Sequence, residues 1–154
     1  MLFRSGAAAL AVPFSALAQP AGKVRRIAYL DYGSRQSMID AGRMTALMQG
    51  LAGFGYVEGR NLVLDARYAE GKVERTDALA AELVAQKPDL ILVAGTPTSR
   101  ALKRATSAIP IVVITTADPV ADGLAATLAR PGGNVTGMSS GGGETVQKIG
   151  RAHV

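Results

Sequence analysis

The 154-residue sequence contains no cysteine and a single histidine, His153, one residue from its end. Without cysteine there can be no disulfide, no thiolate metal site, no cysteine nucleophile and no lipid-modified N-terminal cysteine. A histidine base within the fold is also not expected. The sequence lacks a phosphate-binding loop, a nucleophile elbow and metal ligands at useful spacing. We therefore predict a protein without catalytic residues, metal or cofactor.

Aromatic residues are scarce, at 5%, although 48% of the residues are hydrophobic. A chain of this length can form one domain, whose core would be built from Ala, Val, Leu and Ile. The net charge of +5 comes from basic residues scattered among acidic ones. Few aromatic rings accompany them to stack on bases, so we expect no nucleic-acid partner.

The N-terminal residues have the features of a signal peptide. Arg4 supplies a positive start, residues 6–17 are apolar but too short to span a bilayer, and Ala16-Leu17-Ala18 fits the small-x-small cleavage pattern. We expect a signal peptide at 1–18, a linker at 19–24 and export into a periplasm. Because no cysteine follows the cleavage site, the exported protein should not be a lipoprotein.

The other end has a different character. Three glycines at 141–143 precede a short segment, and the final KIGRAHV at 148–154 resembles a translated sequencing adapter. We expect residues 141–154 to be a hinge remnant followed by adapter-derived sequence, which makes the chain a fragment and removes His153 from consideration. The folded part would then span residues 25–140.

The stretch at 88–105 organises the rest of the chain. Its apolar run LILVA at 90–94 predicts a strand buried in the middle of a parallel sheet. Gly95 permits a tight turn, Thr96 is the predicted helix N-cap, and Pro97 suits the first helical position. The N–H groups at the start of this helix could bind a small carboxylate, or the turn could merely cap the helix.

Other elements alternate around this unit. Strands are predicted at 27–30, 62–68, 109–114 and 135–138, with charges on one face of 62–68 that favour a sheet edge. Helices are predicted from Met44 to a buried Phe54, around Leu79 to Val84, after Thr96 with Ala105 inward, and from Asp118. Five strands alternating with four helices predict an α/β, doubly wound parallel sheet with the flavodoxin-like order 2-1-3-4-5.

In that order the chain reverses direction between the first and third strands, where such sheets bind ligands at the carboxyl ends of the strands. Three loops, at 31–34, 95–99 and 115–118, should meet there. The candidate ligand-binding residues in and beside them are Asp31, Tyr32, Ser34, Thr96, Thr98, Ser99, Thr116 and Asp118.

Hydroxyls, helix-end N–H groups and carboxylates together suit a small zwitterion. Thr96, Thr98 and Ser99 would hold a carboxylate, while Asp118 or Asp31 would pair with an ammonium group. Simpler interpretations stay open for several of them. Asp118 could cap a helix, Asp31 could be a strand-end turn residue, and Tyr32 could either stack on the ligand or pack beneath its loop.

Several stretches resemble the ABC-transporter substrate-binding protein family that includes tryptophan- and tyrosine-binding members. In order along the chain they are GYVEGRN at 55–61, YAEG at 68–71, AAELV at 80–84, AGTP at 94–97, ATSAIPIV at 105–112, DPV at 118–120 and LARPGGNVTG at 128–137. Each alone is a turn signal, but the ordered set is specific and covers roughly residues 25–140.

This resemblance implies one lobe of a type I periplasmic binding protein, truncated before its second lobe. The family's members clamp a small ligand, here expected to be an amino acid or similar zwitterion, and deliver it to an ABC permease in the membrane. In the family, the loops matching 95–99 and 116–118 face the cleft. Two other readings remain, a periplasmic sensor that presents its ligand to a membrane receptor and, more remotely, a flavodoxin-like enzyme.

Overall fold

The computed structural model describes residues 23–116, 118–124, 126 and 133–138. The predicted signal peptide, the first residues of the linker, and the predicted tail with His153 lie outside this part of the chain. In the described residues no helix is both long enough and apolar enough to cross a membrane.

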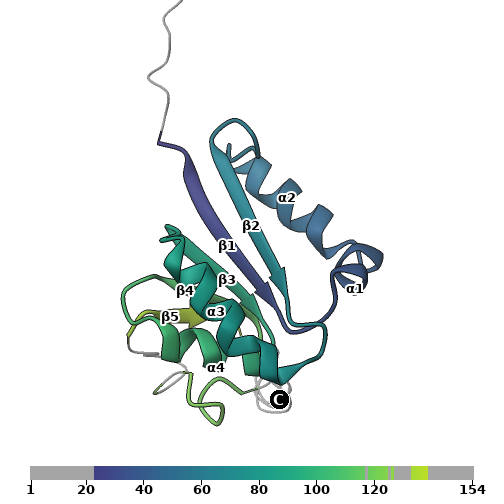
Figure 1. Cartoon of the computed structure of the whole chain (residues 1–154). Coiled ribbons are helices and arrows are strands. Elements are labelled where there is room, and N and C mark those ends of the chain that lie inside the picture. The colour runs from purple at the N-terminus through teal and green to yellow at the C-terminus, as the bar shows by residue number, and fades with distance from the viewer. Residues whose placement is uncertain (1–22, 117, 125, 127–132, 139–154) are drawn as a thin grey trace, which may run out of the picture.

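Five strands form one sheet in which every neighbouring pair is parallel. Their order is β2-β1-β3-β4-β5, which confirms the predicted fold class and strand order (Figure 1). The strands are β1 (Arg25–Asp31), β2 (Leu62–Tyr68), β3 (Leu90–Ala94), β4 (Ile111–Thr115) and β5 (Val135–Gly137). The alternating strand β2 lies at the edge, and the continuously apolar β3 lies in the middle, as their patterns predicted.

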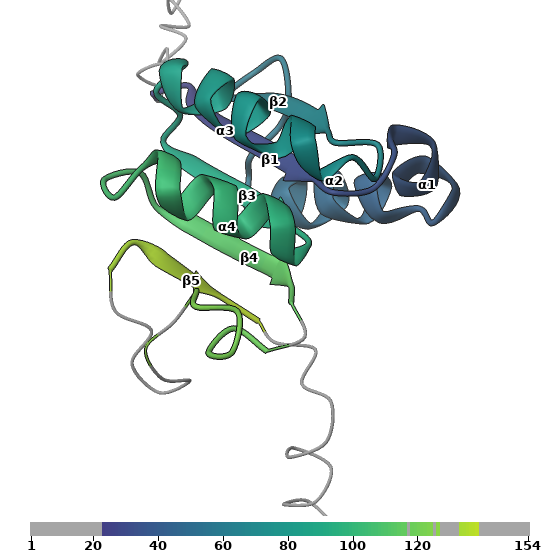
Figure 2. The same ribbon diagram turned by 60° about the horizontal axis from the view of Figure 1, so that its bottom comes forward.

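Helices cover both faces of the sheet. They are α1 (Arg35–Asp40), α2 (Arg43–Gly53), the short 3-10 helix η1 (Val73–Arg75), α3 (Thr76–Ala85) and α4 (Thr96–Ala105). Figure 2 shows α3 and α4 side by side on one face, with α1 and α2 on the other. This arrangement divides the core into two clusters of apolar side chains.

The cluster beneath α3 and α4 is the better buried of the two. Leu83 from α3 and Leu102 from α4 are completely buried against Ile91 and Val93 of β3. Burying such a side chain stabilises a fold by about 1.5–3 kcal/mol. The prediction that Ala105 is also inward is wrong, because it lies at the exposed end of α4.

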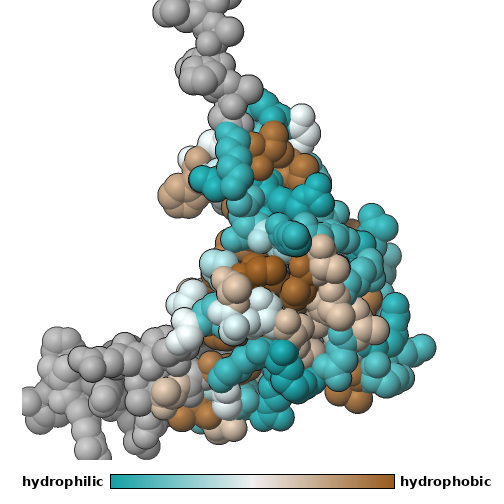
Figure 3. Space-filling view, turned by 60° about the vertical axis from the view of Figure 1, so that its left-hand side comes forward, coloured by the Kyte–Doolittle hydropathy of each residue, from teal (hydrophilic) through white to brown (hydrophobic). Residues whose placement is uncertain are grey.

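The opposite face is less completely covered. Met38 of α1 is buried, but no residue of α2 is. Val112 and Ile114 of β4, which point to this side, are only partly buried. In the view of Figure 3, apolar side chains reach the surface in the middle of the molecule, bordered by hydrophilic ones.

Other local features also differ from the sequence predictions. Helix α2 ends at Gly53, so Phe54 falls just beyond it and is 86% exposed instead of buried. Helix α1 was not predicted, since its six residues are too few for a helical period to show. The predicted helix from Asp118 is replaced by hydrogen-bonded turns as far as Leu124, where Gly123 has a φ of +69° that interrupts a right-handed helix.

Candidate functional site

The loops that follow β1 and β3 are packed directly against each other at the carboxyl edge of the sheet. The N–H of Tyr32 donates to the carbonyl of Ala94 over 3.1 Å. Gly95 has a φ of +97°, and a Cβ atom there would lie only 2.7 Å from the Cβ of Tyr32. Both the conformation and the close approach require glycine. Because α4 begins at Thr96, Gly95 is its N-cap residue, and the prediction that Thr96 is the N-cap is wrong.

Both oxygens of the Asp31 carboxylate accept hydrogen bonds from other groups of the protein. Its Oδ2 accepts a 2.7 Å hydrogen bond from the Tyr29 hydroxyl, and its Oδ1 accepts one of 2.7 Å from the N–H of Gly33. Burial raises the pKa of Tyr29, and the hydrogen bond to Asp31 and its charge raise it further. Asp31 thus anchors the loop after β1, which fits its interpretation as a strand-end turn residue; its predicted pairing with a ligand ammonium stays a prediction.

Tyr32 and Ser34 connect this loop to its surroundings. The Tyr32 hydroxyl donates to the carbonyl of Gly71 over 2.8 Å, which ties together the loops after β1 and β2. Ser34 is the N-cap of α1, and its Oγ accepts from the N–H of Ser37 over 3.0 Å. Both are partly exposed, so a ligand at this edge could reach them.

Thr98 and Ser99 are placed differently from the other candidates. They are 0% and 1% exposed. The Thr98 hydroxyl lies 2.7 Å from the carbonyl oxygen of Ala94 and 2.8 Å from that of Gly95, and the Ser99 hydroxyl donates to Gly95 over 2.8 Å. Their side chains fasten the first turn of α4 and do not reach the surface in this conformation.

Asp118 makes a local cap in the loop after β4. Its Oδ1 accepts hydrogen bonds of 3.0 Å from the N–H groups of both Val120 and Ala121. The residue is exposed, so the capping interpretation describes its contacts in the structure while a ligand could still approach it.

Asp122 joins the loops after β3 and β4 and was not among the predicted residues. Its Oδ2 accepts from the hydroxyls of Thr96 and Thr116 over 2.8 and 2.7 Å. Arg100 of α4 donates to Asp122 Oδ1 over 3.1 Å and to its backbone carbonyl over 3.0 Å. The Thr116 hydrogen bond, aided by Thr96 and the Arg100 charge, holds the pKa of Asp122 below its usual value.

Sequence reasoning missed Asp122 because it predicted a helix starting at Asp118 and assigned Asp122 no role in it. A single helical turn forms there and ends at once, with the N–H of Gly123 donating to the carbonyl of Val120 over 2.9 Å and that of Leu124 to the carbonyl of Pro119 over 2.8 Å. The only available signal was Gly123, whose left-handed conformation ends the segment. The structure therefore brings Thr96, Thr116 and Asp122 together, with Asp118 on the same turn.

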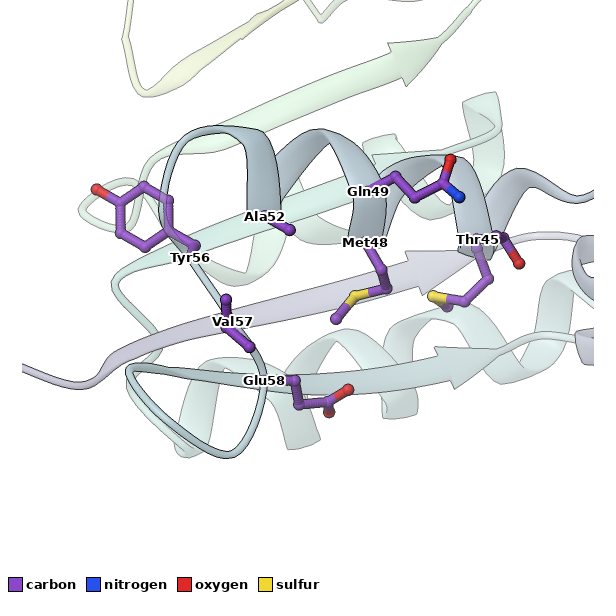
Figure 4. Close-up of a pocket in the computed structure, with 8 residues that line it drawn as sticks. Thr45, Met48, Gln49, Ala52, Tyr56, Val57 and Glu58 are labelled. Atoms are coloured by element: carbon purple, nitrogen blue, oxygen red, sulfur yellow. The ribbon is translucent and has the colours of Figure 1, made fainter.

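A separate groove lies along α2, away from these loops. It has a volume of about 470 Å³ and lies between α2 and the segment that follows it (Figure 4). Its walls include Met44, Met48, Ala52, Tyr56, Val57 and Glu58. The groove contains none of the predicted site residues and brings only one carboxylate to a mainly apolar surface.

Residues 35–149 match the family model of the ABC transporter substrate binding proteins. The chain belongs to this family. It is 40% identical over 85 residues to a tyrosine-binding protein of Clostridioides difficile, a match that covers 55% of this chain and 25% of the relative. The family resemblance noted in the sequence is thereby confirmed.

Solved structures agree with this assignment. A conserved domain protein from Vibrio cholerae superposes with a TM-score of 0.72 at 35% identity, covering 83% of this chain and 42% of the other. A Streptococcus pneumoniae ABC domain in complex with L-Trp gives 0.67 at 30% identity, covering 75% and 38%. A ligand-free, open substrate-binding protein with adhesive properties from Clostridium difficile gives 0.71 at 32% identity, covering 82% and 43%.

The chain thus spans less than half the length of these relatives. The family and its tyrosine-binding member are substrate-binding proteins, not enzymes, which agrees with the lack of a catalytic constellation in the sequence. Substrate-binding proteins of this kind take small molecules as ligands and are usually extracellular or periplasmic.

Proposed function

We propose that this chain is the N-terminal lobe, residues 25–140, of the solute-binding component of an ABC importer. The lobe binds one side of an amino acid, most favourably an aromatic one, and a second lobe closes over the other side. The loaded protein then delivers the amino acid to a permease in the membrane. Of the predicted ligand-binding residues, the exposed or partly exposed ones would contact the ligand in this proposal: Tyr32, Ser34, Thr96 and Asp118. The buried ones would shape the loops beneath it: Asp31, Thr98, Ser99 and Thr116.

The observation that carries the proposal is the joining of three loops at the switch point of the sheet. Tyr32 contacts Gly95, and Thr96 shares Asp122 with Thr116, so the loops after β1, β3 and β4 form one connected edge. Ligands bind at this edge in open parallel sheets. Relatives at 30% to 40% identity that are named for tyrosine or crystallised with L-Trp support an aromatic amino acid.

The proposal is tested on the complete reading frame of the source locus, including any second lobe. Its melting temperature is measured with each of the common L-amino acids in excess. L-tryptophan or L-tyrosine should raise it, because a ligand that binds only the folded state stabilises that state by mass action. The double variant Thr96→Ala, Asp118→Ala should lose this shift.

A matched control carries the same two substitutions elsewhere, at Thr45 of α2 and Asp40 of α1, both exposed. This control should keep the full shift. If no amino acid raises the melting temperature, the amino-acid assignment is wrong. If the control loses the shift and the Thr96, Asp118 variant keeps it, the ligand binds on the α2 side instead. Loss of amino-acid uptake on deletion of the gene distinguishes an importer from a sensor, which would leave uptake intact.

We propose further that residues 1–18 direct export to the periplasm. The support is the positive start, the short apolar segment and the small-x-small pattern before Gln19. Residues 1–24 fused to a reporter that is active only outside the cytoplasm should give activity. The double variant Arg4→Glu, Leu10→Glu should abolish it, and an active reporter in that variant would contradict the proposal.

A further inference from the structure

Two hydroxyl groups converge on one carboxylate oxygen at the candidate site. Thr96 Oγ1 and Thr116 Oγ1 lie 2.8 and 2.7 Å from Asp122 Oδ2, and 3.4 Å from each other. An ionised carboxylate carries no proton and can only accept hydrogen bonds. Each hydroxyl has a single proton, so both protons are directed to Asp122.

Several contacts keep Asp122 in its ionised form. Arg100 donates to Oδ1 over 3.1 Å and thereby places a guanidinium charge next to the carboxylate. The hydrogen bonds from the two threonines also favour the charged form, and the pKa of Asp122 is lowered accordingly. The orientation of the Thr96 hydroxyl therefore follows from the charge of its neighbour.

The other two hydroxyl groups in the first turn of α4 also use their protons in hydrogen bonds within the protein. Thr98 and Ser99 direct their protons to the carbonyls of Ala94 and Gly95. The Thr96 hydroxyl is partly exposed and donates its proton to the Asp122 carboxylate. Towards a molecule at this edge it can therefore act only as a hydrogen-bond acceptor. The Thr96 hydroxyl therefore favours a hydrogen-bond donor of the ligand over an anionic group.

We propose that Asp122 determines which end of the ligand binds here: Thr96 accepts a hydrogen bond from the ligand's ammonium group, and the ligand's carboxylate is held by other groups. This inference rests on the proposed function and reverses the sequence prediction that Thr96 holds the carboxylate. Asp122 is a positioning residue in this scheme, acting through the hydroxyl whose proton it binds.

The test uses three probes on the complete reading frame: L-tryptophan, tryptamine, which keeps the ammonium but lacks the carboxylate, and indole-3-propionate, which keeps the carboxylate but lacks the ammonium. Calorimetry gives the ratio of the tryptamine affinity to the indole-3-propionate affinity, which should depend on Thr96 and Asp122. In Asp122→Asn the side-chain amide can donate to the threonines and release their protons. The ratio of the two affinities should fall about tenfold or more, as expected when one charge-assisted hydrogen bond is lost.

Two further variants make the result specific. Asp65→Asn removes a carboxylate of similar exposure that is also paired with an arginine, Arg26, and should leave the ratio unchanged. Thr96→Val removes only the hydroxyl, with nearly the same shape, and should weaken tryptamine and L-tryptophan but not indole-3-propionate. It tests the inference even if Asp122→Asn does not fold.

The possible outcomes separate the inference from the function on which it rests. If the wild type binds L-tryptophan but Thr96→Val weakens indole-3-propionate and leaves tryptamine unchanged, the inference is overturned and the proposed function stands. The same holds if neither Thr96→Val nor a folded Asp122→Asn changes the preference. If the wild type binds neither L-tryptophan nor any other amino acid, the proposed function fails and the inference fails with it.

Discussion

The hydroxyl group of Tyr29 donates a 2.7 Å hydrogen bond to the carboxylate of Asp31, two residues further along β1. Residues two apart in a strand point to the same face, so the bond runs along the surface of the central part of the sheet. The same hydroxyl lies 3.3 Å from the sulfur of Met38 in α1, and Asp31 in turn holds the N–H of Gly33. One buried tyrosine thereby links the strand, the loop and the helix that follows it.

Tyr29→Phe should lower the free energy of unfolding by about 1–3 kcal/mol, because it removes one hydrogen bond of a buried carboxylate and leaves that group less satisfied. Urea unfolding followed by circular dichroism measures the change. Tyr56→Phe, which removes a hydroxyl from an exposed tyrosine, serves as the control and should change the value by less than about 0.5 kcal/mol. Equal effects of the two substitutions would show that the Tyr29–Asp31 bond contributes nothing.

Gly95→Ala should destabilise the protein by about 1–3 kcal/mol, since the new Cβ would meet Tyr32 in a conformation that L-residues rarely adopt. Gly50→Ala is the contrasting change, because Gly50 lies inside α2 with open space where its Cβ would be. Alanine there should stabilise the helix by about 0.5–1 kcal/mol. Thermal and urea unfolding of both variants measure these changes. A Gly95→Ala variant as stable as the wild type would contradict the prediction.

The sheet could be predicted because each strand has a recognisable pattern of apolar and charged residues within its own short segment. The run at 90–94 is apolar on both faces and became the central strand, while the charges of Asp65 and Arg67 placed β2 at the edge. Right-handed crossovers then left one favoured strand order.

The candidate site was predictable only as a set of loops. The sequence indicated that Thr96 and Thr116 would approach each other, but not that Asp122 would lie between them. That contact depends on a turn after β4 whose path is set by tertiary contacts with Arg100 of α4, 22 residues earlier in the chain. No local pattern reports such a contact. Whether Thr98 and Ser99 face a ligand was likewise undecidable, since a hydroxyl in the first turn of a helix can turn outward or bond to the backbone.

Leu102→Ala should lower the free energy of unfolding by about 2–5 kcal/mol, more than Tyr29→Phe or Gly95→Ala. The side chain is fully buried between α4 and the sheet, and its removal leaves a cavity. The exposed Phe54 offers the comparison, and Phe54→Ala should change the free energy of unfolding by no more than about 0.5 kcal/mol. Chemical denaturation of the two variants measures both values. A small effect at Leu102 would mean that the cluster beneath α3 and α4 is not the main core.

The lowered pKa of Asp122 predicts how stability depends on pH. Its pKa in the folded state is below the value of about 3.8 expected when unfolded, so the unfolded state binds a proton first as the pH falls. The stabilisation that comes from the ionised carboxylate is complete above that unfolded value and is lost as the pH falls through the folded one. Asp122→Asn has no such carboxylate. The difference in unfolding free energy between wild type and Asp122→Asn should therefore stay constant between about pH 7 and pH 5 and shrink below about pH 4.

Urea midpoints at several pH values measure this difference, with Asp65→Asn as the variant that removes an equal charge elsewhere. The difference between wild type and Asp122→Asn must respond to acid more strongly than the difference between wild type and Asp65→Asn, because it alone includes the hydrogen bonds from Thr96 and Thr116. If both differences change in parallel, the loss reflects the general protonation of carboxylates and not the Asp122 contacts. In that case the charge that orients the two threonine hydroxyls would also be in question, since the same ionised carboxylate underlies both effects.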